Sequence, residues 1–140
     1  MNDVEEMGWL APETESDLHE AFESVGPAAQ TVVRETTKAM EFDRAEYDER
    51  VDGAVVETAR DALFASLLAV RVADRETFES WREDYDGDVH VAGSDNVDRV
   101  VWHVAPVADA AVAATFQDER DAAVATLRRQ AFGRLYDDLL

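Results

Sequence analysis

The spacing of the apolar residues changes near residue 68, and this change constrains the fold more than any other feature of the sequence. Before it, apolar residues recur at helical spacing, for example Leu18 and Phe22. After it, Val70 and Val72 alternate with other side chains, as they do in a strand. The pattern predicts N-terminal helices followed by the order β-α-β-β-β-α, which is an α+β fold.

Caps and connection lengths refine this prediction. Asp43 and, three residues later, Glu46 form a capping box that predicts a helix start. Asp74 and Asp118 are expected to cap two later helices, and residues 97–105 are the best strand candidate. Because the links between the predicted strands are short, we expect an antiparallel sheet of three to four strands packed on helices.

The chain has the length of one domain. We find no repeat or linker that would divide it, so we expect a single acidic α+β domain over residues 1–140. Residues 1–11 are the segment in which we allow for flexibility. Trp9 is expected to dock this segment on the body of the protein. The alternative is an exposed Trp9 that meets a partner.

Acidic residues greatly outnumber basic ones. The chain has 32 Asp and Glu residues against 13 Lys and Arg residues, for a net charge of −19, and the acids are spread along the sequence rather than gathered in a block. Such a charge repels itself in dilute buffer, whereas molar salt shortens the Debye length to about 3 Å. We therefore expect adaptation to high intracellular salt. The alternative is an acidic face that binds a partner.

Several classes of protein are excluded or disfavoured by what the sequence lacks. It has no cysteine, which excludes disulfides and thiol catalysis. The first ten residues lack the basic and apolar regions of a signal peptide, and no apolar run approaches 18 residues. The sequence contains none of the motifs of serine hydrolases, P-loop enzymes, dinucleotide-binding domains or zinc proteases. We expect a cytoplasmic protein without a cofactor, a metal, a membrane contact or an identifiable catalytic residue.

Alternation along the predicted strands collects polar side chains on one face of the sheet. A hairpin through residues 93–96 would place two histidines on that face, together with arginines that bind carboxylate or phosphate well. The predicted ligand-binding residues are Arg71, His90, Arg99 and His103. The competing interpretation is a half-solvated face whose polar groups are paired. Two histidines without a third ligand do not make a zinc site.

Two predicted helical stretches are poor in acids. Residues 24–40 contain one acid, Glu35, and residues 122–136 contain none. In an acidic protein such surfaces favour contact with a protein partner or a second copy of the chain. The predicted contact residues are Arg34, Lys38, Arg128, Arg129 and Arg134. The competing interpretation is that these side chains pair with neighbouring carboxylates and the helices are interior. Nucleic acid is disfavoured because the net charge opposes phosphate binding.

Four segments resemble a small uncharacterised family of haloarchaeal proteins: residues 25–33, 42–48, 96–103 and 114–119. The resemblance covers most of the chain after residue 12. It implies a haloarchaeal source and carries no known activity, so it assigns no functional residue.

These observations lead to one predicted function and two alternatives. We predict a non-enzymatic cytoplasmic protein-interaction module, either a homodimer or the partner of another protein. The first alternative is a ligand-binding or enzymatic domain that uses His90, Arg99 and His103. The second is a nucleic-acid accessory protein that uses the arginines of the contact set.

Overall fold

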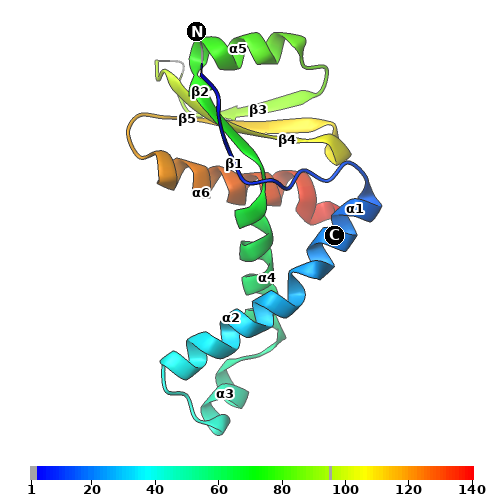
Figure 1. The fold of residues 1–140 in the computed structure, drawn as a ribbon, viewed down its shortest axis with the longest axis vertical. Coiled ribbons are helices and arrows are strands. Elements are labelled where there is room, and N and C mark those ends of the chain that lie inside the picture. Colours follow the sequence, from blue (N-terminus) through cyan, green and yellow to red (C-terminus); the bar gives the residue numbers. More distant parts are fainter. Residues whose placement is uncertain (1–2, 95) are drawn as a thin grey trace.

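A mixed β-sheet and a projecting helical arm are the two parts of the molecule, as Figure 1 shows. The computed structural model describes residues 3–94 and 96–140. The strands are β1 (Glu5–Met7), β2 (Val70–Asp74), β3 (Asp88–Ala92), β4 (Arg99–Ala105) and β5 (Ala110–Phe116). Their order in the sheet is β1-β2-β4-β5-β3.

Helices cover both faces of this sheet. The helices are α1 (Glu15–Ser24), α2 (Gly26–Ala39), α3 (Arg44–Arg50), α4 (Gly53–Leu67), α5 (Arg75–Asp84) and α6 (Arg120–Ala131), and short helical turns follow α6. α5 lies on one face, and α6 lies on the other with α1 and the C-terminal part of α4 (Figure 1). We call residues 26–63, which comprise α2, α3 and most of α4, the helical arm. It extends away from the sheet.

The α+β prediction and the order of elements from β2 to α6 are confirmed. The sheet itself differs from the prediction because it has five strands and β3 runs parallel to β5. β4 is apolar on both sides, which favours a central place between β2 and β5. The more exposed β3 is therefore left at the edge beyond β5, and no β3–β4 hairpin forms.

Each face of the sheet has its own core. On the α6 side, the aromatic ring of Phe64 lies 5.5 Å from Phe22, 5.7 Å from Phe132 and 5.7 Å from Tyr136, measured between ring centroids. On the α5 side, the Trp102 ring lies 5.2 Å from Phe78. The large core on the α6 side therefore joins the sheet to the base of the helical arm.

Side-chain caps begin most of the helices. The Asp43 carboxylate accepts a hydrogen bond of 2.8 Å from the Glu46 amide, and Asp74 accepts one of 2.8 Å from the Thr77 amide, which confirms both predicted caps. The prediction for Asp118 is wrong, because α6 begins at Arg120 with Glu119 at its N-cap. A one-residue error of this kind is expected where several acids adjoin a helix start.

Candidate functional site

The structure separates the residues predicted to bind a ligand. Residues paired directly across a sheet point to the same side. His103 and His90 both pair with Val112, so the two histidines share the α6 side, as the alternation suggested. Arg71 pairs with Trp102 and points to the opposite side, where α5 packs. The four residues therefore do not line one open face.

His103 belongs to the core. It is completely buried, with Nδ1 2.5 Å from the Ala69 carbonyl oxygen and Nε2 2.6 Å from the Tyr136 hydroxyl. Because a carbonyl can only accept, Nδ1 carries the proton and Nε2 accepts from the tyrosine. Burial lowers the pKa of His103 to about 4 and raises the pKa of Tyr136. His103 is therefore a neutral structural residue at neutral pH.

The other two residues of this set lie apart from His103. The Arg99 guanidinium lies 5.0 Å from the centroid of the Phe116 ring, at the beginning of β4. His90 is exposed on the edge strand β3, where it lines an open cavity of about 330 Å³ together with Gln130 and Arg134 of the C-terminal region. Among the residues that the structure describes, no three metal-ligating side chains gather into a metal site.

The predicted contact residues fall into two separate places. Arg34 and Lys38 are exposed on α2 in the helical arm, whereas Arg128, Arg129 and Arg134 lie on or just after α6, beneath the sheet (Figure 1). Lys38 also pairs with Glu35 at 3.3 Å. The two acid-poor helices therefore do not form one continuous surface.

Arg128 has a structural role. Its Nε donates a hydrogen bond of 3.0 Å to the Leu68 carbonyl at the end of α4, and burial lowers its pKa. The backbone of Gly8 passes so close that an added Cβ would lie 2.7 Å from Arg128 Nη2, and Gly8 has a φ of +80°. Arg128 thus bonds α6 to the end of α4, and the N-terminal segment passes close beside it at Gly8.

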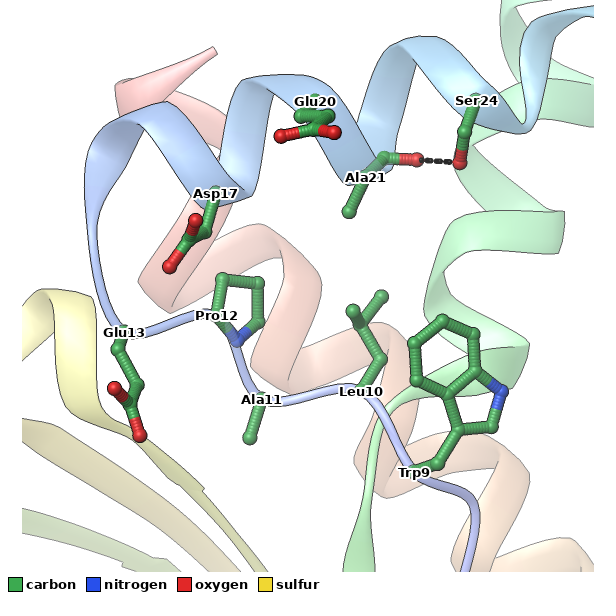
Figure 2. A pocket seen from close by; sticks show the side chains of 9 residues that line it. All are labelled: Trp9, Leu10, Ala11, Pro12, Glu13, Asp17, Glu20, Ala21 and Ser24. Atoms are coloured by element: carbon green, nitrogen blue, oxygen red, sulfur yellow. Dashed lines mark hydrogen bonds between the residues drawn. The ribbon is translucent and has the colours of Figure 1, made fainter.

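Trp9 is 70% exposed, so the expectation that it docks in the core is wrong. Leu10 takes the buried place instead, because its backbone pairs with the Leu67–Leu68 region. Figure 2 shows Trp9 at one end of a cavity of about 450 Å³ between the N-terminal segment and α1, with Asp17 and Glu20 on the helix above it. On its other side Trp9 lines a second cavity, of about 350 Å³, over the sheet.

The helical arm is the least buried part of the fold. From residue 38 to residue 63, all of which the structure describes, no residue is fully buried. α2 contributes Ala29, Val33 and Thr37 to its contact with α4. Val32, Met40 and Val55 are 46%, 58% and 39% exposed. The sequence predicted helices in this region and the start of α3 but had no signal for the lack of a covering layer.

A model of the family of unknown function DUF5809 matches residues 9–137. The chain belongs to this family. No curated protein and no solved structure matches it. Within the described part of the chain, none of the helices is both long and apolar enough to cross a bilayer.

Proposed function

We propose that this DUF5809 protein is a non-enzymatic interaction module that pairs with a second copy of itself through the helical arm. The supporting observation is the run of residues 38–63, which holds the end of α2, α3 and most of α4 but no fully buried residue. Short helices in water are marginal and draw most of their stability from tertiary packing. An arm with so little packing of its own needs a covering surface.

The arm carries the apolar groups that such a contact would bury. Val32, Met40 and Val55 are exposed, and Phe42 and Tyr47 are only partly buried. Burying an apolar side chain of this size contributes about 1.5–3 kcal/mol. These groups lie on α2, α3 and α4 and at the turn between α2 and α3, so the contact would extend along the arm.

Charge favours a second copy as the occupant. Two chains of net charge −19 repel each other least where acids are few, and α2 carries Arg34 and Lys38 against the single acid Glu35. α3, at the tip of the arm, is acidic. A two-fold arrangement that sets α2 of one copy against α3 of the other would therefore bring complementary charges together.

The size of the contact requires the whole arm. α2 has 14 residues and is therefore about 21 Å long. A strip of that length and about 10 Å wide has an area of about 210 Å², whereas a stable interface buries roughly 800 Å² per partner. α3 and α4 must therefore contribute. Two such arms would form a bundle of helices with a shared core.

The setting that we propose for this dimer is the salt-rich cytoplasm of a haloarchaeon. The evenly spread net charge of −19 supports it, as does the resemblance of four segments to haloarchaeal proteins. Dissolved ions at molar concentration screen charges beyond about 3 Å, which would let two acidic copies approach.

The test is the mass of the intact chain in solution, measured by light scattering in molar KCl. The wild-type protein is expected to be dimeric, and Val32→Glu is expected to weaken the dimer at least about tenfold, because it puts an acid on the acid-poor helix. Val4→Glu is the matched control: Val4 is 42% exposed and precedes β1, outside the arm. A monomeric wild-type chain, or a dimer equally resistant to both substitutions, would contradict the proposal.

A further inference from the structure

The strand β3 forms one edge of the sheet and has β5 as its neighbour. α5 packs mainly on β2 and β4, and α6 packs mainly on β4 and β5, so β3 lies beyond the main contacts of both helices. Four of its five residues are exposed, and the exposed fraction of Val91 is 41%. The outer edge of β3 is therefore open along the whole strand.

The two edges of the sheet differ in their protection against pairing with another chain. Natural edge strands are kept from such pairing by short length, charged side chains or proline. β1 has three residues, and two of them, Glu5 and Glu6, are acidic. β3 has five residues with a single acid, Asp88 at its start, and continues as Val-His-Val-Ala without lysine, arginine or proline. The β3 edge therefore has the features of a surface that accepts an added strand.

A groove follows β3 on the α6 side. Two cavities of about 330 Å³ and 370 Å³ adjoin there, because Ala92 of β3 and Gln130 of α6 line both of them. His90 and Arg134 line the first cavity, and Arg134 is exposed and forms none of the ion pairs found among the described residues. Glu119, in the second cavity, is the one acid among the described residues of the two linings. In a chain with 32 acids, the groove is thus a place where a carboxylate from outside meets little repulsion.

A strand added beside β3 would meet two different surfaces. His90 and Ala92 face the α6 side, since they pair with β5 residues that pack in the core on that side. Every second side chain of the added strand would therefore lie over the groove, where Arg134 can bind a carboxylate. The remaining side chains would lie beside Val89 and Val91 on the α5 side, which favours apolar groups.

We propose that β3 accepts an extended acidic segment of a partner protein as a sixth strand of the sheet, with carboxylates over the groove and apolar side chains beside Val91. Main-chain hydrogen bonds supply the affinity, and the alternate side chains supply the specificity. A second copy suits the groove less well. Paired with itself over its full length, β3 would offer one carboxylate, Asp88, and would set two His90 rings opposite each other.

The test uses the intact protein in molar KCl and a heptapeptide with blocked ends, Val-Glu-Val-Glu-Val-Glu-Val. Amide hydrogen exchange of residues 88–92 is expected to slow at least about threefold with the peptide at millimolar concentration, because new hydrogen bonds form along the edge. Residues 5–7 of β1 are the internal control and should exchange at an unchanged rate. The same peptide with lysine in place of glutamate should slow exchange less, because it is repelled by Arg134.

Three results would overturn the proposal. The first is unchanged exchange of residues 88–92, and the second is equal slowing by the glutamate and lysine peptides. The third is slowing that follows the concentration of the protein without any peptide, which would assign the edge to a second copy.

A substitution in β3 tests the edge from the side of the protein. Val91→Glu places an acid beside the apolar side chains of the added strand and is expected to weaken peptide binding at least about tenfold. Val4→Glu is the matched control, because Val4 is similarly exposed, at 42%, and precedes β1. Equal affinity of the two variants would contradict the assignment. The edge lies on the sheet, apart from the helical arm, so a monomeric wild-type chain that still binds the peptide would refute the dimer alone (Figure 1).

Discussion

At the scale of single residues, His103 shows how a polar side chain is accommodated in an apolar core. Both ring nitrogens have partners, the Ala69 carbonyl and the Tyr136 hydroxyl, so burial leaves neither unpaired. Protonation would turn Nε2 into a donor and place a charge in the core. Burial therefore lowers the pKa to about 4, and the charge of the nearby Arg128 acts in the same direction.

This pKa predicts a dependence of stability on pH. A histidine in the unfolded chain titrates near pH 6.5, so between about 6.5 and about 4 the unfolded state binds a proton that the folded state does not. The free energy of unfolding is expected to be highest above pH 6.5 and to fall by roughly 3 kcal/mol as the pH is lowered to 4. Urea unfolding in molar KCl at a series of pH values measures this fall in the free energy of unfolding.

The control for this prediction is His90→Gln, because His90 is exposed on β3. That variant should show the same fall in unfolding free energy as the wild type. A wild-type protein whose unfolding free energy stays constant over this pH window would contradict a buried, neutral His103.

At the scale of elements, local signals account for the helices better than for the strands. The Asp43 cap and the start of α3 follow from neighbouring residues alone. β1 has three residues, two of them acidic, and it exists because it pairs with β2 and because Arg120 of α6 bonds the Glu5 carboxylate. Because these partners are distant in the sequence, the pattern of neighbouring residues does not predict β1.

The cap of α3 gives a prediction at this scale. Asp43→Ala removes the acceptor of the 2.8 Å bond from the Glu46 amide and is expected to destabilise α3 by about 1 kcal/mol. Faster amide hydrogen exchange over residues 44–50 would report it. Asp48→Ala, within the same helix, is the control and should leave exchange unchanged. Similar exchange rates in both variants would show that Asp43 does not hold the helix start.

At the scale of the whole molecule, the net charge is the feature from which we expect the largest effect of salt on stability. With a net charge of −19 on 140 residues, compact packing brings carboxylates close together, and dissolved ions reduce their repulsion. Many of the buried residues in the two cores are alanine and valine. We therefore infer that the folded state depends on screening to a greater degree than in a protein of balanced charge.

The melting temperature is accordingly expected to rise steeply with KCl concentration from dilute buffer to molar salt. Exchanging several exposed glutamates, such as Glu13, Glu20 and Glu23, for glutamine should make the melting temperature depend less on KCl concentration, because fewer carboxylates then repel one another. Calorimetry of both proteins across the same salt series makes the comparison. If the wild-type protein melts at the same temperature throughout, the acidic surface has a purpose other than salt adaptation.

The sequence by itself determined the class of the fold. Apolar spacing distinguishes helix from strand because it reflects which side of each element meets the core, and that information is local. The order of elements from β2 to α6 follows from this spacing, the caps at Asp43 and Asp74 follow from the residues around each helix start, and the acidity follows from composition. The candidate residues on α2 could also be placed on a helix in this way, whereas their exposure could not.

Tertiary structure alone decided the register of the sheet and hence the candidate sites. Val100 and Val101 are both apolar, so the alternation in β4 does not say which of them faces α6, and a shift of one residue exchanges the two faces. Pairing of Val72 with Val101 sends His103 into the core and sets Arg71 beside Trp102. The acceptor for a buried imidazole and the groove beside β3 depend on residues far apart in the chain, and only folding brings these together.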